Sequence, residues 1–143
     1  MSPEAIVSGI ADIAETLAHL HAASFYHRDI KPSNLLRYSG RWVLADFGLV
    51  TFPDKNDNTP VNTKLGPEHF LAPEMQKDAT SANNGAADVY SLAKTLWALL
   101  TDHTFPPPGE HRISSELFRL ESWVPNNDRV RQSIQGQLRW IML

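Results

Sequence analysis

The chain has 143 residues, of which 42% are apolar and 20% charged, with a formal net charge of -3 at pH 7. This length suits one compact domain or a large piece of a bigger one, and the composition is that of a globular protein. The slight acidity argues against a nucleic-acid-binding protein, and the apolar content argues against a disordered chain.

The chain contains no cysteine, which excludes disulfides and thiolate metal sites and suits a reducing compartment. Its start lacks the positively charged region of a signal peptide, and no segment approaches the roughly 20 apolar residues that span a bilayer. We therefore expect a cytoplasmic chain without a membrane segment.

The first predicted element is a helix that begins after Ser2 and ends near Ala23. Ser2 can cap it and Pro3 suits its first turn. Its apolar residues recur at three-to-four spacing, as an amphipathic helix requires. They are Ile6, Val7, Ile10, Ile13, Ala14, Leu17 and Leu20.

A small hairpin is predicted next, with strands at residues 35–37 and 41–45 and turn residues at 38–40. Periodicity then disappears over residues 49–73, a connection so long that it is usually functional or disordered. After a polar loop at 78–85, the run DVYSLAKTLWALL is apolar on nearly every face and predicts a buried helix.

The C-terminal third carries weaker signals. The stretch PPPG at 106–109 breaks the chain, a short helix is predicted around 115–121, and Asn127 can cap a last helix. No repeat or shift in composition marks a second domain. The predicted fold class is mainly α with a small β-hairpin.

The stretch HRDIKPSNLL combines an acid, a cation and an amide just before the hairpin. Folding the hairpin back about its turn brings Asn34 and Asp46 to the same end, with Asp29 and Lys31 in the loop that leads in. One carboxylate and one amide oxygen suit Mg²⁺, which takes further ligands from water and substrate phosphates. Asp29 is then free to act as a base, and Lys31 can neutralise charge on a phosphoryl group.

Four motifs follow one another in a fixed order: HRDxKxxN at 27–34, DFG at 46–48, APE at 72–74 and DVYSL at 88–92. Each alone is weak, since Asp, Asn and Gly are common at turns. Together they resemble the C-terminal lobe of the eukaryotic-type protein kinase family, serine/threonine type, from the first helix to about residue 100. DVYSLAKTLWALL is more similar to prokaryotic members than to animal ones.

This resemblance implies ATP- and Mg²⁺-dependent phosphorylation of a protein substrate on serine or threonine. Asp29 matches the catalytic aspartate that accepts the hydroxyl proton. Asn34 and Asp46 match the two Mg²⁺ ligands, and Lys31 matches the phosphate-contacting lysine of serine/threonine kinases. The catalytic residues implied are thus Asp29 and Lys31, and the cofactor-binding residues are Lys31, Asn34 and Asp46.

The resemblance also implies scaffold roles. His27 and Phe47 match positions that pack and orient the catalytic loop and the metal-binding segment, and Asp88 matches a buried acid that holds the catalytic-loop backbone. His19 and His21 lie two positions apart on the first helix, so they point to different faces, which favours surface or packing roles over a metal pair.

Regulation has weaker support. Arg28 resembles the arginine that pairs with a phosphorylated activation segment in many kinases. Three threonines between DFG and APE are candidate phosphosites, although each is equally well explained as a solvated loop residue. They are Thr51, Thr59 and Thr63.

The sequence departs from the family in three ways that bear on activity. One is that it ends before any recognisable late arginine that would pair with Glu74, so we expect Glu74 to be unpaired. Only 28 residues precede Asp29, and they contain no glycine-rich loop, strand lysine or helix glutamate. We therefore expect residues 1–143 to be a partial kinase domain, truncated at both ends and inactive alone, with the N-lobe absent. Pro67 stands where the family often has a hydroxyl that bonds the catalytic aspartate and lysine, so that bond is lost or replaced.

Two functions stay open. In one, the chain is the C-lobe of a kinase whose N-lobe is encoded separately or upstream. In the other, it is a non-catalytic lobe that binds a partner, such as another kinase, through the face that an N-lobe would cover. Small-molecule phosphotransferases share the distant fold, but they lack an APE segment and their loop patterns differ from HRDIKPSN and DFG.

Overall fold

The computed structural model describes residues 1–52, 69–77 and 84–107. The predicted helices at 115–121 and after Asn127 lie outside these ranges, as do Thr59, Thr63 and Pro67. The described part is mostly helical with one antiparallel hairpin, which confirms the predicted class. Its elements are α1 (Pro3–Ala22), the 3-10 turn η1 (Pro32–Asn34), β1 (Leu35–Tyr38), β2 (Arg41–Leu44), the 3-10 turn η2 (Phe47–Leu49), α2 (Pro73–Lys77) and α3 (Asn84–Thr101).

Helix α1 begins and ends as its sequence predicts. The Ser2 hydroxyl accepts a hydrogen bond from the Ala5 N–H at 3.3 Å, which satisfies one of the free donors of the first turn. The buried face consists of Ile6, Gly9, Ile10, Ile13 and Leu17, with Val7 and Leu20 partly buried against it. Ala14, predicted to share this face, is exposed.

The hairpin closes through a two-residue turn at Ser39 and Gly40. Both residues have positive φ, 49° and 83°, as a type I′ turn requires. Leu35 pairs with Leu44 and Tyr38 with Arg41. The first strand is therefore one residue longer than predicted and the second one residue shorter.

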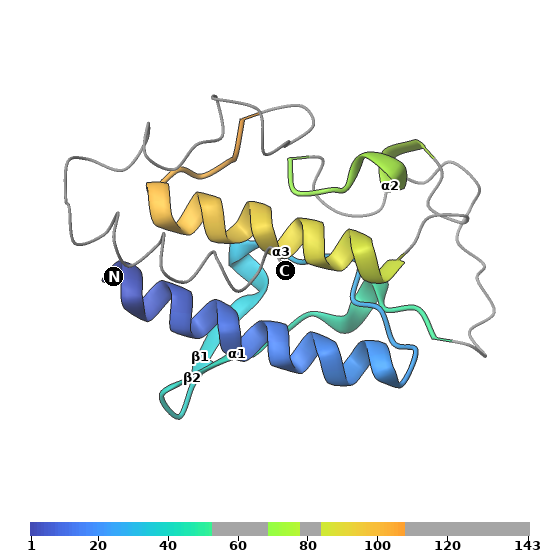
Figure 1. Cartoon of the computed structure of the whole chain (residues 1–143), viewed down its shortest axis with the longest axis horizontal. Helices are drawn as coiled ribbons and strands as arrows, with labels where there is room; N and C mark the ends of the chain where they lie inside the picture. Colours follow the sequence, from blue (N-terminus) through green and yellow to red (C-terminus); the bar gives the residue numbers. More distant parts are fainter. Residues whose placement is uncertain (53–68, 78–83, 108–143) are drawn as a thin grey trace, which may run out of the picture.

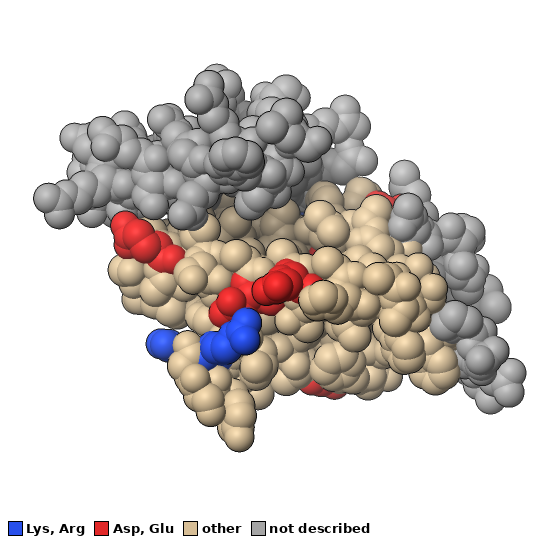
Figure 2. Space-filling model, turned by 60° about the horizontal axis from the view of Figure 1, so that its bottom comes forward, with Lys and Arg blue, Asp and Glu red and all other residues tan. Residues whose placement is uncertain are grey.

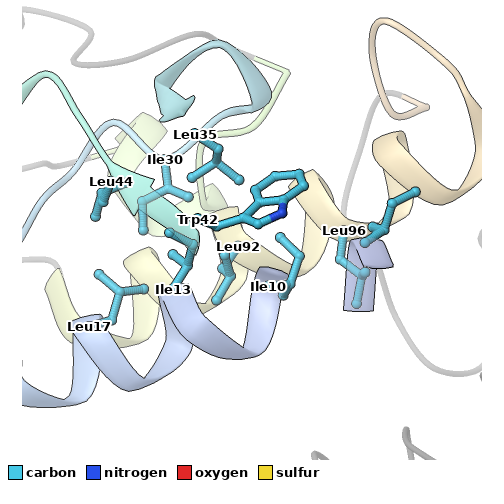
Figure 3. Close-up of a cluster of buried hydrophobic side chains, with 10 residues drawn as sticks. Ile10, Ile13, Leu17, Ile30, Leu35, Trp42, Leu44, Leu92 and Leu96 are labelled. Carbon is cyan, nitrogen blue, oxygen red and sulfur yellow. The ribbon is translucent and has the colours of Figure 1, made fainter. Parts of the chain in front are cut away.

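The main core lies between α1, α3 and the hairpin. Figure 1 shows α1 and α3 side by side with the hairpin against α1, and α1 contacts both α3 and β2. In Figure 3 the Trp42 indole lies among Leu35, Ile10 and Leu92, so all three elements meet on one side chain. The predicted buried helix is confirmed as α3, although Val89 is exposed on it.

Helix α2 was not predicted. It has only five residues, too few for a hydrophobic period to show. It forms because the Ala72 carbonyl accepts the N–H groups of Met75 and Gln76. Leu71, Ala72 and Met75 pack against Ala87 of α3, so tertiary contact stabilises this short helix.

The surface of the described part is weakly charged. On the face in Figure 2, a small patch of Lys and Arg lies directly against Asp and Glu. One exposed pair joins Arg41 to Asp12 at 3.7 Å, a distance and exposure at which an ion pair contributes little stability. Within the described ranges, no helix is both long and apolar enough to cross a bilayer.

The contact between Gly9 and Trp42 gives a test of this packing. A Cβ at Gly9 would overlap the Trp42 indole, so we expect Gly9→Ala to lower the free energy of unfolding by about 1 to 3 kcal/mol. Without that overlap, the same change inside a helix stabilises by up to about 1 kcal/mol. Urea unfolding measures the sign.

Two variants complete this test. Ser8→Ala, at an exposed neighbouring position of α1, is the control and should be neutral or stabilising. Trp42→Leu combined with Gly9→Ala should recover part of the loss, since the smaller side chain leaves room for the methyl group. A more stable Gly9→Ala protein would contradict the described packing.

Candidate functional site

The loop before the hairpin is anchored by a carboxylate from α3. Asp88, only 1% exposed, accepts the His27 N–H at 2.8 Å and the Arg28 N–H at 2.7 Å. His21 of α1 adds a contact from Nε2 to the same carboxylate at 2.9 Å. These bonds offset the cost of burying the charge. The predicted role of Asp88, holding the loop backbone, is confirmed.

The loop has a second anchor on its other side. Tyr26 and Thr51 exchange two backbone hydrogen bonds, each of 3.0 Å. Between the anchors, Arg28 adopts a positive φ of 67°, which few residues other than glycine adopt. The surrounding hydrogen bonds therefore impose an unfavourable conformation directly before Asp29.

His27 links the loop to the end of the hairpin. Its Nδ1 accepts the Asp29 N–H at 3.4 Å and its Nε2 lies 3.1 Å from the Ala45 carbonyl. The ring is fully buried and meets Phe47 edge to face, with centroids 4.9 Å apart. The packing predicted for both residues is confirmed, although Phe47 is itself 49% exposed.

Burial lowers the pKa of His27 below its ordinary 6.5, while the charges of Asp88 and Asp29 act in the opposite direction. Because Nδ1 must be unprotonated to accept the Asp29 N–H, the neutral ring carries its proton on Nε2 and donates it to Ala45. This fixes the tautomer.

Asp29, Lys31 and Asn34 meet on one oxygen atom. Asp29 Oδ2 lies 2.8 Å from Lys31 Nζ and accepts the Asn34 side-chain amide at 2.9 Å. The same Asn34 amide also donates to the Asp29 carbonyl at 2.8 Å. The second carboxylate oxygen, Oδ1, is buried and accepts no hydrogen bond from the described residues.

Asn34 and Asp46 lie on the two arms of one hairpin end. The Asn34 carbonyl accepts the Ala45 N–H at 2.9 Å, which extends the strand pairing by one residue and leaves Asp46 next along the chain. Asp46 is exposed, has a φ of 63°, and its Oδ1 accepts the Gly48 N–H at 3.3 Å.

The oxygen atoms here fit a hard divalent cation. The Asn34 amide nitrogen is used on Asp29, which leaves its Oδ1 oxygen as a ligand, and Asp46 offers an exposed carboxylate. Among the described residues, no group of three or more His, Asp or Glu could hold a metal ion. In proteins, Mg²⁺ commonly takes several of its ligands from water and phosphates.

The sequence does not predict some features of the site. His21 contacts Asp88 from 67 positions away, and the cavity beside Lys31 joins segments that are far apart in the chain. No local pattern indicates either. The sequence also does not indicate the positive φ angles of Arg28 and Asp46, since neither residue is a glycine.

Comparison with known proteins identifies a matching family and several similar proteins. Residues 1–137 match the protein kinase domain family. The chain is 35% identical over 138 residues to serine/threonine-protein kinase PknL of Mycobacterium tuberculosis and 31% identical over 144 residues to serine/threonine-protein kinase PrkC of Bacillus subtilis. It is also 36% identical over 120 residues to serine/threonine-protein kinase PkaB of Streptomyces coelicolor.

These alignments cover most of the chain but a minor part of each relative. They span 96% of the chain and 34% of PknL, 100% of the chain and 22% of PrkC, and 78% of the chain and 28% of PkaB. The chain therefore corresponds to about a third of the length of these bacterial kinases, or less.

The buried His27 gives a test by NMR. We expect its ring to keep the Nε2–H tautomer and to titrate below 6.5, because burial lowers its pKa. The unfolded chain then takes up a proton where the folded chain does not, so the contribution of His27 to stability is complete above about pH 6.5 and is lost as the pH falls.

Ring ¹⁵N shifts between pH 7.5 and 5 identify the tautomer and the pKa. Unfolding free energies of the wild type and His27→Gln should converge as the pH falls, by at most about 1.4 kcal/mol per pH unit. A ring protonated on Nδ1 at pH 7.5 would contradict the described hydrogen bonds. A pKa above 6.5 would contradict the expected effect of burial.

Proposed function

The chain belongs to the protein kinase family, and on that premise we propose that it forms the catalytic C-lobe of a bacterial serine/threonine kinase. Its reaction would be transfer of the terminal phosphoryl group of ATP to a protein hydroxyl. One observation carries the proposal. Asp29 is a buried carboxylate with one oxygen fixed by two donors and the other without a hydrogen-bond donor among residues 1–52, 69–77 and 84–107.

Asp29 is suited to receive the substrate hydroxyl. Lys31 and Asn34 hold its Oδ2, so the carboxylate cannot rotate freely, and Oδ1 stays available as an acceptor. In the proposed reaction, a serine or threonine hydroxyl donates to Oδ1 and transfers its proton there. The hydroxyl oxygen forms the new bond to phosphorus as the bond to the ADP oxygen breaks.

The other polar groups supply charge and coordination. The Lys31 ammonium lies beside Asp29, where it can offset negative charge on the phosphoryl group. Asn34 Oδ1 and the Asp46 carboxylate would hold Mg²⁺. When bound, Mg²⁺ neutralises phosphate charge and fixes the phosphate oxygens.

One observation favours a second candidate function. Leu36 of β1 and Phe47, which follows the hairpin, are 51% and 49% exposed, and large exposed apolar side chains can belong to an interface. In this second candidate, which we propose as the alternative, the chain is a non-catalytic lobe that binds a partner kinase through these side chains. In the first candidate an N-lobe covers them, and we propose that residues 1–143 are inactive without it. The cytoplasmic location is likewise a prediction.

Nucleotide binding is the first test of the proposed function. We expect calorimetry of the 143-residue chain to show ATP binding that requires Mg²⁺, and Asp46→Asn to weaken it by roughly 10- to 100-fold, as loss of metal-site support typically does. Asp12→Asn changes an exposed acid on α1 and is the matched control. Absence of Mg²⁺-dependent binding would favour the second candidate, a binding lobe.

Phosphoryl transfer tests Asp29. In a complete kinase domain that supplies the N-lobe, we expect Asp29→Asn to lower transfer to a generic basic protein by roughly 10²- to 10⁴-fold, the range for loss of a general base. ATP affinity and the thermal unfolding midpoint should change little, since the amide keeps the shape of the carboxyl group. Transfer that survives this substitution would remove Asp29 from the mechanism.

A further inference from the structure

Two histidines from different parts of the chain meet one carboxylate. His21 of α1 places its Nε2 2.9 Å from Asp88 Oδ2, and the His27 backbone N–H donates to the same oxygen at 2.8 Å. The Asp88 side chain is only 1% exposed, whereas the His21 side chain is 20% exposed. A proton from solvent can therefore reach His21, directly beside a carboxylate that is itself buried.

The His27 ring lies within the electrostatic field of the same carboxylate. Burial lowers the pKa of His27, and the negative charge of Asp88 is the largest effect in the opposite direction. The hydrogen bond to the Ala45 carbonyl and the charges of Asp29 and Asp46 also favour the protonated ring. Negative charge therefore acts on His27 from α3, from the loop and from the end of the hairpin.

The position of the His21 ring is fixed by two contacts. Its Nε2 is held at the Asp88 carboxylate, and the ring packs against Tyr26 with centroids 5.4 Å apart. Tyr26 is in turn held by its two backbone hydrogen bonds to Thr51. A charge on His21 therefore stays beside Asp88 and does not move out into water, where it would be screened.

A proton on His21 would offset part of the charge on Asp88. Imidazole is the side chain that ordinarily gains its charge between pH 5 and 8. The positive ring would lie 2.9 Å from the carboxylate, so the negative field that favours protonation of His27 would be weaker. His27 would then stay neutral to a lower pH, and its Nδ1 would continue to accept the Asp29 N–H.

We propose that His21, Asp88 and His27 form one proton-responsive unit that holds the loop around Asp29 in place as the pH falls. When His21 carries a proton, its charge acts through Asp88 and opposes protonation of His27. The Asp29 N–H then keeps its acceptor. The unit requires neither nucleotide nor Mg²⁺, so it can operate whether or not the chain takes part in phosphoryl transfer.

Ring ¹⁵N shifts of the full 143-residue chain, in buffer without Mg²⁺ or nucleotide, test this unit. His21→Gln keeps a hydrogen-bond donor for Asp88 but cannot become charged. In this variant we expect His27 to take up its proton roughly 0.5 to 1 pH unit higher than in the wild type, less than for a charge in direct contact. His19→Gln, at an exposed position two residues away on α1, is the control and should leave the His27 titration unchanged. An unchanged or lowered midpoint in His21→Gln would overturn the inference.

His21→Lys separates the effect of charge from that of shape. It keeps a positive charge near Asp88 but loses the ring that packs against Tyr26. We therefore expect the His27 midpoint in His21→Lys to be no higher than in the wild type. A rise as large as that in His21→Gln would show that the lost ring moves the titration, and the proposed role of the charge would be wrong.

Hydrogen exchange of the Asp29 amide measures the loop itself. Where His27 is protonated, its Nδ1 no longer accepts the Asp29 N–H, which then exchanges faster. At a pH above both His27 midpoints, we expect this amide to exchange roughly three- to tenfold faster in His21→Gln than in the wild type, the ratio of protonated rings for a shift of about 0.5 to 1 unit. Equal exchange in the two proteins would show that the unit does not hold the loop.

The wild-type chain offers a check that needs no substitution. Because His21 and His27 contact the same carboxylate oxygen, their titrations should be coupled. We expect the ring shifts of His27 to show a smaller step at the pH at which His21 titrates. A single-step titration of His27 that is independent of His21 would refute the coupling.

Discussion

The candidate site depends on one buried carboxylate in the middle of the core. Asp88 belongs to α3, yet it accepts the backbone N–H groups of His27 and Arg28, which lie 61 and 60 positions earlier. Because an unpaired buried charge is costly, this carboxylate and the loop stabilise each other. The loop backbone then fixes Asp29, so the packing of α3 sets the position of the proposed base.

The candidate site also depends on the packing of the hairpin against α1. Trp42 of β2 packs into the space that Gly9 leaves on α1, which seats the hairpin on the core. The open end of that hairpin carries Asn34 and Asp46. Of the two ligands proposed for Mg²⁺, Asn34 is held by its backbone bond to Ala45, and Asp46 directly follows that bonded residue.

The sequence predicted those parts of the fold that depend on residues close together in the chain. The cap at Ser2, the apolar spacing of α1, the turn at Ser39 and Gly40, and the apolar run of α3 each follow from nearby residues. Motif order placed Asp29 and Asn34 in one loop. The contact of His21 with Asp88, the helix α2 and the cavity beside Lys31 depend on segments that meet only in three dimensions. The spacing of residues along the sequence does not predict contacts between such distant segments.

The hairpin turn has a consequence for how this chain can vary. At Gly40, added atoms meet nothing within 4 Å, and the neighbouring Tyr38 is 73% exposed. The turn lies at the opposite end of the hairpin from Asn34 and Asp46. Extra residues, a fluorophore or a tether introduced there would extend into solvent and leave the site intact. The chain thus offers a permissive attachment point on the same element that carries its proposed metal ligands.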